Sequence, residues 1–174
     1  MPDNVKIWTN VGSAGTLTQA DLAKVTLHGS IIQLGAEIVS TGGGTTTTSA
    51  LAAAQNTVQA VVRYNVTPVD GLFLTVPFRY HLQIRFRNHI TAKLVETDML
   101  SGTEKQLISF NSQSFPPQPG FQVQAVPAAA NSTVMDFVNK AYYVDATLIA
   151  PAIAVGSPAE ISVVKVFASP NFAG

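Results

Sequence analysis

The chain has 174 residues, no cysteine, and ten basic and ten acidic side chains. The absence of cysteine excludes disulfides, thiolate metal sites and a cysteine nucleophile. The even charge argues against nucleic acid as a partner, because such binders usually carry a basic excess that neutralises phosphates. At this length one domain covering residues 1–174 is the simplest arrangement, and it is large enough to bury a core without staples.

Charged residues make up only 11% of the chain, against about 25% in typical soluble domains. The surface must therefore be covered by neutral polar and small apolar residues, which protect poorly against association. Two interpretations are open: a soluble domain with a neutral polar surface, or a subunit that buries much of its surface against copies of itself.

Targeting and membrane segments are not expected in the chain as given. Its first residues lack the charged and apolar regions of a signal peptide. The most apolar run, residues 146–155, is too short to span a bilayer and contains Pro151. The sequence assigns no compartment.

The first third of the chain begins with a short apolar stretch in which Trp8 is expected to be a core anchor. Thr18 and Asp21 have the spacing of a capping box, which predicts one or two helical turns, although residues 24–34 could instead be mostly strand. The alanine-rich residues 49–55 fit a short helix or a strand. Residues 57–66 alternate between apolar and polar, which predicts a strand.

The clearest pattern is the strict alternation of residues 78–87, which predicts a central strand with one face in a core and one in water. The apolar side consists of Phe78, Tyr80, Leu82, Ile84 and Phe86. The polar side consists of Arg79, His81, Gln83, Arg85 and Arg87.

Further strands are predicted over residues 90–95, 105–110, 121–126, 134–138, 142–149 and 160–168. Alternation in the second of these is poor, and simple counting places Gln106 on the same side as Ile108 and Phe110. The last of them is mostly apolar on both sides, which predicts a place in the middle of a sheet covered on both faces. A turn is expected at residues 101–104.

Together these segments predict an all-β fold of roughly nine or ten short strands. Strands do not alternate with long helices, which argues against a parallel α/β sheet. We expect an antiparallel β-sandwich with at most one or two short helices, and it could be of the jelly-roll type.

The motifs of known catalytic and metal sites are absent from the sequence. His28, His81 and His89 do not have the spacing of zinc ligands on one element, and there is no nucleophile elbow. The carboxylates are spread singly, so the sequence cannot pair them as a glycosidase would. We therefore predict no catalytic residue, no metal and no cofactor, and we expect that the chain is not an enzyme.

A basic stripe is the one remaining candidate site, with half of all basic residues between positions 63 and 93. It could be a solvated outer face, or its arginines could pair with Glu96, Asp98 or Glu104. It could also recognise an anionic ligand, a sugar acid or a nucleic-acid backbone. The candidate binding residues are Arg63, Arg79, His81, Arg85, Arg87 and Lys93.

Composition and the missing motifs favour a non-enzymatic structural β-sandwich that associates with copies of itself, as a homo-oligomer or as a capsid-like, tail-like or filament-like assembly. The alternative is a small binding module for carbohydrate or an anionic ligand. Such a module would use the basic stripe or a loop aromatic such as Phe115 or Phe121. An enzyme with dispersed acids is the least favoured hypothesis.

Overall fold

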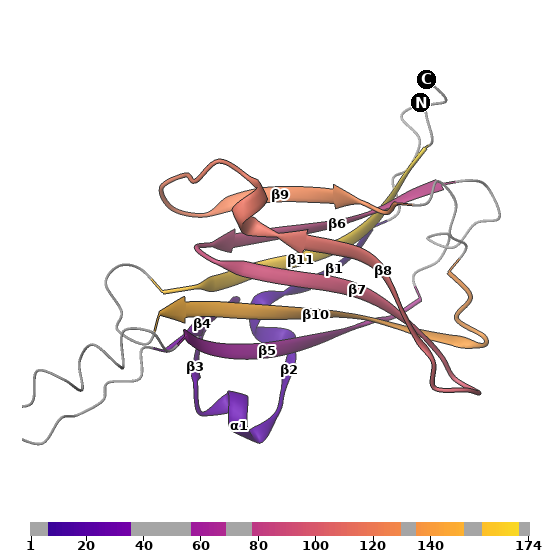
Figure 1. Ribbon diagram of the computed structural model, residues 1–174, viewed down its shortest axis with the longest axis horizontal. Coiled ribbons are helices and arrows are strands. Elements are labelled where there is room, and N and C mark those ends of the chain that lie inside the picture. The colour runs from indigo at the N-terminus through magenta and orange to yellow at the C-terminus, as the bar shows by residue number, and fades with distance from the viewer. Residues whose placement is uncertain (1–6, 36–56, 69–77, 130–134, 152–157, 171–174) are drawn as a thin grey trace, which may run out of the picture.

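The computed structural model describes residues 7–35, 57–68, 78–129, 135–151 and 158–170, which form two antiparallel β-sheets (Figure 1). The six-stranded sheet contains β1 (Ile7–Val11), β3 (Val25–His28), β4 (Ile31–Leu34), β6 (Phe78–Arg87), β9 (Gln122–Pro127) and β11 (Glu160–Pro170). The five-stranded sheet contains β2 (Thr16–Leu17), β5 (Thr57–Val66), β7 (Ile90–Asp98), β8 (Glu104–Asn111) and β10 (Lys140–Pro151).

The strand order of the six-stranded sheet is β3-β4-β11-β6-β9, and β1 also pairs with β11. The other sheet has the order β2-β5-β10-β7-β8. β11 therefore lies in the middle of its sheet, as its apolar sequence predicts. The predicted central strand, β6, lies between β11 and β9. The predicted all-β sandwich is confirmed.

Helical structure is limited in the described residues to α1 (Gln19–Leu22) and the 3-10 turns η1 (Gly12–Ala14) and η2 (Ser112–Ser114). Thr18 caps α1 as predicted: its Oγ accepts the Asp21 N–H at 3.1 Å and donates to the Asp21 carboxylate at 2.9 Å. No helix in the described part of the chain has the length and apolar character to span a membrane.

One apolar core fills the space between the sheets, because alternate residues of every long strand point inward. Trp8 belongs to this core, as predicted. The core-facing side of β6 is the one that the alternation predicted, and one set of alternate residues also faces the core in β5 and β10. The largest fully buried side chains are Tyr64, Phe86, Phe110, Ile32, Leu34, Leu82, Ile84, Ile90, Leu94, Leu148 and Ile161.

A β-bulge in β8 overturns one predicted side assignment. Leu94 of β7 pairs with Ile108, but Val95 pairs with Gln106, so Leu107 is an extra residue in the ladder. Gln106 consequently faces outward and is exposed, whereas Ile108 and Phe110 face the core. A bulge changes the side of every residue beyond it, which simple counting could not anticipate.

The strand predicted over residues 134–138 is also wrong for its described part, 135–138, which precedes β10 as a turn. The carboxylate of Asp136 accepts the backbone N–H groups of Val138 and Asn139 at 2.9 and 3.2 Å. This local capture of N–H groups competes with a strand ladder. The expectations for residues 49–55 lie outside the described residues.

Candidate functional site

The predicted basic stripe is divided between two faces of the molecule. Four of its members lie on β6 in the six-stranded sheet, and two lie on β5 and β7 in the other sheet. Because the sheets pack core to core, their outer faces point in opposite directions. The β6 group is Arg79, His81, Arg85 and Arg87, and the other group is Arg63 and Lys93.

On the outer face of the six-stranded sheet, two arginines of β6 contact an aromatic ring. The guanidinium carbons of Arg85 and Arg87 lie 4.4 and 4.7 Å from the ring centre of Phe121, within the range of cation–π attraction. Arg85 also donates to the Ser162 hydroxyl at 2.9 Å, and Arg87 pairs with Glu160 at 3.3 Å. Both arginines thus contact the ring of Phe121.

Arg79 and His81 on the same face are also engaged. The Nε of Arg79 donates to the backbone oxygen of Ala128 at 3.1 Å. The His81 ring stacks on Phe167 with a centroid separation of 4.9 Å and an interplanar angle of 9°. Burial lowers the pKa of His81, the charge of Arg79 lowers it further, and a contact with the Arg79 carbonyl partly opposes the shift. The basic residues of this face therefore already contact other side chains or backbone oxygens of the chain.

On the outer face of the five-stranded sheet, the strand register aligns outward side chains in rows across four strands. What we call the charged row contains Arg63, Asp145, Lys93 and Ser109. What we call the neutral row, one pleat further along, contains Val61, Thr147, Thr91 and Asn111. Residues distant in sequence thus become direct neighbours.

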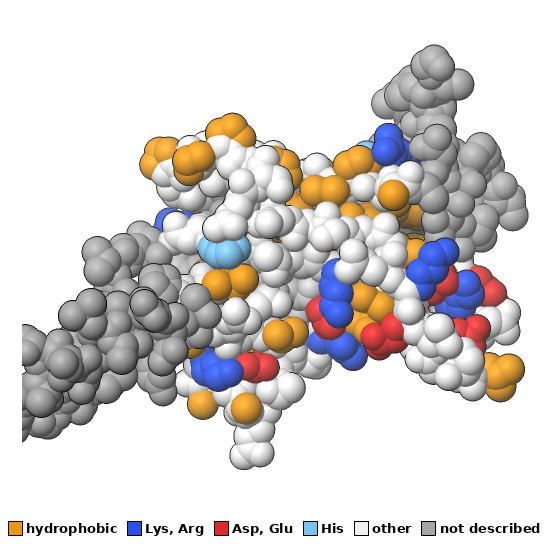
Figure 2. Space-filling view, viewed as in Figure 1, with side chains coloured by type: hydrophobic (Ala, Val, Ile, Leu, Met, Phe, Trp, Pro, Cys, Tyr) orange, Lys and Arg blue, Asp and Glu red, His pale blue; other side chains and the backbone are white. Residues whose placement is uncertain are grey.

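Asp145 compensates the charge at the centre of the charged row. Arg63 donates to its two carboxylate oxygens at 2.7 and 2.8 Å, and the Lys93 ammonium lies 3.9 Å away. The bond to Asp145 raises the pKa of Arg63. Basic and acidic side chains lie next to one another on the face seen in Figure 2 rather than forming a patch of one sign.

The Arg63 guanidinium also covers the ring of Tyr143, with its central carbon 3.8 Å from the ring centre. The Tyr143 hydroxyl donates to Glu104 at 2.6 Å. Burial raises the pKa of Tyr143, and this bond to the carboxylate raises it further. Two arginines of the stripe therefore pair with acids, as one interpretation predicted, but Arg63 pairs with Asp145 and Arg87 with Glu160 instead of Glu96, Asp98 or Glu104.

An open groove of about 420 Å³ follows the neutral row and part of the charged row. Neutral hydrogen-bonding side chains from three strands line it, together with Lys93 and Asp145. Two of them fall within the strands predicted over residues 90–95 and 142–149, but only the register and the bulge bring the set together. These neutral residues are Thr91, Gln106, Ser109, Asn111 and Thr147.

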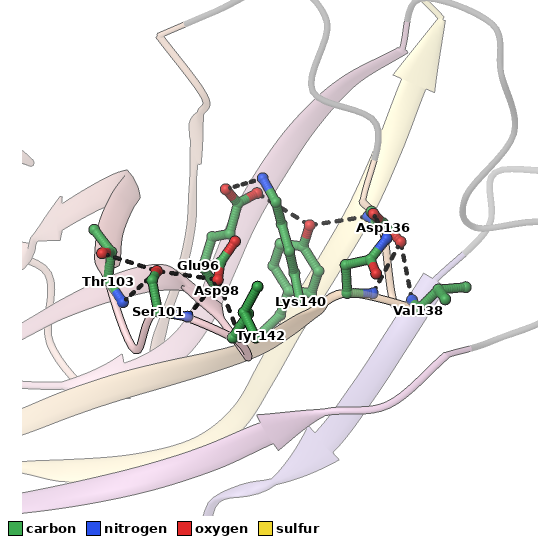
Figure 3. A network of polar contacts seen from close by, with 10 residues as sticks. Glu96, Asp98, Ser101, Thr103, Asp136, Val138, Lys140 and Tyr142 are labelled. Carbon is green, nitrogen blue, oxygen red and sulfur yellow. Dashed lines mark hydrogen bonds and ion pairs between the residues drawn. The ribbon is translucent and has the colours of Figure 1, made fainter.

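A second polar network closes one end of the five-stranded sheet (Figure 3). The Glu96 carboxylate pairs with Lys140 at 2.6 Å and accepts the Tyr142 hydroxyl at 3.0 Å. The Tyr142 hydroxyl in turn accepts the Asp136 N–H at 2.9 Å. Asp98 accepts N–H and O–H groups from its own turn, including both from Ser101. Because other groups of the chain already bind these carboxylates, we interpret the network as one that stabilises the fold, and we call it the lock.

Comparisons with known proteins give neither a family model nor a curated protein that matches the chain. Solved structures with a similar chain path include a cyclase from Fischerella sp. TAU (14% identity, TM-score 0.42, 64% of this chain and 57% of that chain). This chain thus spans less than two thirds of that protein. The Stig cyclase Fisc from the same organism matches with 13% identity, a TM-score of 0.44, and 98% and 78% coverage. A family 29 carbohydrate binding module matches with 10% identity, a TM-score of 0.35, and 97% and 84% coverage.

These structures correct one expectation. The prediction that the chain is not an enzyme is wrong as a deduction from missing motifs, and the solved structures reported above include two cyclases. Absence of a linear motif excludes little in a β-sandwich, where strand pairing brings distant residues together. At TM-scores below 0.5 the likeness in turn assigns neither an activity nor a ligand to this chain.

Proposed function

We propose that the protein binds a neutral carbohydrate in the groove on the outer face of the five-stranded sheet. The observation that carries this proposal is the neutral row, in which Thr147, Thr91 and Asn111 lie side by side across three strands. Their hydroxyl and amide groups can each donate and accept hydrogen bonds. Sugar hydroxyls need the same combination of donors and acceptors.

The charges around the groove favour a neutral ligand over an anion. Arg63 is bound through two hydrogen bonds to Asp145, and only Lys93 lies loosely beside that carboxylate. An incoming anion would have to compete with Asp145 for both cations. Val61 is 40% exposed at one end of the neutral row and offers an apolar contact for the C–H face of a sugar ring.

Titration calorimetry with neutral linear hexasaccharides of glucose, xylose, mannose and galactose tests the proposal. Thr147→Val removes one hydroxyl at nearly constant volume, so we expect affinity to fall about fivefold for each hydrogen bond lost. Thr26→Val, on exposed β3 and outside the groove, is the matched control and should leave affinity unchanged. Absence of binding at millimolar concentration, or equal loss in both variants, would refute the groove as the site.

An anionic ligand is the competing outcome of the same assay. A sulfated hexasaccharide that binds while its neutral counterpart does not, with affinity that falls steeply as salt is added, would replace the neutral ligand. The self-association predicted from the low charge stays a prediction from composition, and binding in the groove does not depend on it.

A further inference from the structure

A second hollow, of about 350 Å³, lies at one end of the sandwich, where β6 turns into β7 and where η2 and the following loop lead to β9. The turn between β6 and β7 is tight, with Asn88 in the left-handed region at φ 62°. Its amide donates to the backbone oxygen of Pro158 at 2.7 Å. The hollow shares none of its lining residues with the groove on the five-stranded sheet.

Gln122 is the unusual residue in this hollow. It is the first residue of β9 and pairs with Phe86 of β6. The alternation of β9 leaves Val123 52% exposed but turns Gln122 inward, so that this glutamine is only 8% exposed. Its side-chain oxygen is buried and has no hydrogen-bond partner among the described residues. A buried acceptor without a partner lowers stability, which a fold tolerates where the group has a use.

Aromatic side chains form the apolar wall beside Gln122. The rings of Phe86 and Phe110 meet edge to face at 5.4 Å, and Phe115 lies against Phe110 at 5.5 Å. Phe86 and Phe115 line the hollow, and the exposed amides of Gln113 and Gln118 lie at its margin. No carboxylate, lysine or arginine belongs to the lining residues that the structure describes.

We propose that this hollow is a second binding site, for a small neutral molecule with a flat apolar ring and one N–H donor. The ring would lie against Phe115, and the N–H would donate to the unpaired oxygen of Gln122. The volume falls within the usual range of small-molecule pockets, roughly 300–1,000 Å³. An apolar wall with a few convergent polar groups is the usual composition of such sites. The site is independent of carbohydrate binding in the groove.

Benzamide supplies the ring and the N–H donor, and N,N-dimethylbenzamide is the same ring without the donor. Binding is followed by ¹H–¹⁵N correlation spectra of the full chain. We expect benzamide to shift the side-chain amide signals of Gln122, Gln113 and Gln118. We expect the dimethyl compound to bind at least tenfold more weakly. No shift at millimolar benzamide, or equal binding of both compounds, would overturn the proposal.

The variant Gln122→Met removes the unpaired oxygen and retains the side-chain length. We expect benzamide affinity to fall at least tenfold, while the melting temperature stays equal to that of the wild type or rises. Gln124→Met, two residues along the same side of β9, is the matched control and should bind as the wild type does. Unchanged affinity in Gln122→Met, or a lowered melting temperature from loss of a satisfied glutamine, would overturn the proposal. The wild-type comparison of the two benzamides does not require any variant to fold.

Discussion

Replacing single tyrosines by phenylalanine tests how strongly the lock in Figure 3 stabilises the fold. The Tyr142 hydroxyl joins three segments, because it accepts the Asp136 N–H before β10 and donates to Glu96 at the end of β7. Tyr64 is the matched control, since it is as little exposed as Tyr142 and its hydroxyl makes one bond, to the backbone oxygen of Gly12 at 2.8 Å. Tyr→Phe removes only the oxygen in each case.

The expected magnitudes follow from the number and charge of the bonds. A neutral hydrogen bond contributes about 1 kcal/mol, and one to a charged group about 1.5–3 kcal/mol. Tyr142→Phe removes one bond of each kind, so unfolding free energy should fall by roughly 3 kcal/mol. Tyr64→Phe should cost about 1 kcal/mol. For a domain of this size these values correspond to melting temperatures lower by roughly 6–12 °C and 2–4 °C.

Urea unfolding followed by circular dichroism, with thermal melts as a second probe, measures both changes. Tyr143→Phe adds a third point: its hydroxyl bonds to the exposed Glu104, where water can replace it, so the cost should stay below about 1 kcal/mol. The expected order of losses is Tyr142, Tyr64, Tyr143. If Tyr64→Phe costs as much as Tyr142→Phe, the argument that a buried carboxylate strengthens the lock is refuted.

Three further predictions follow from single features. The lowered pKa of His81 means that the unfolded chain takes up this proton at higher pH than the folded one, so stability should fall as pH decreases from about 6.5 through that lowered pKa. His81→Phe, which keeps a ring against Phe167, should lose this part of the pH dependence. If the unfolding free energy from urea titrations changes equally with pH in the variant and the wild type, the prediction is wrong. A methyl group on Gly12 would overlap the carbonyl of Ile161, so Gly12→Ala should cost about 2 kcal/mol. Gly29→Ala, which has open space but a φ of 58°, should cost less in the same melts. Self-association predicts a mass many times 18.4 kDa by light scattering after size exclusion, and a monomer would contradict it.

The fold was predictable because the period of two is a local property of the chain. In β5, β6 and β10 each inward side chain is followed by an outward one, and this alternation continues along the whole strand. Prediction failed where a local contact interrupts the period. Leu107 adds one residue to β8 and sends Gln106 to the other face, and the carboxylate of Asp136 captures N–H groups that a strand would need.

The candidate site was harder to predict because sheet membership depends on partners distant in sequence. Arg63 on β5 and Arg79 on β6 are close in the chain, yet β5 pairs with β10 and β6 pairs with β11. The stripe therefore separates onto opposite faces. Thr91 and Thr147 fall within strands that the sequence predicts, but nothing in the sequence states that they are opposite one another.

Ion pairs within the fold neutralise several of the few charges that the chain carries. Asp145 binds Arg63, Glu160 binds Arg87, and Glu96 binds Lys140, so several of the few charges neutralise one another within the fold. Such pairs contribute little field beyond a Debye length of about 8 Å at physiological salt. A ligand that approaches the groove on the five-stranded sheet meets mainly hydroxyl and amide groups. Recognition should then depend on hydrogen bonds and shape, and the affinity for a neutral hexasaccharide should change little between low and high salt.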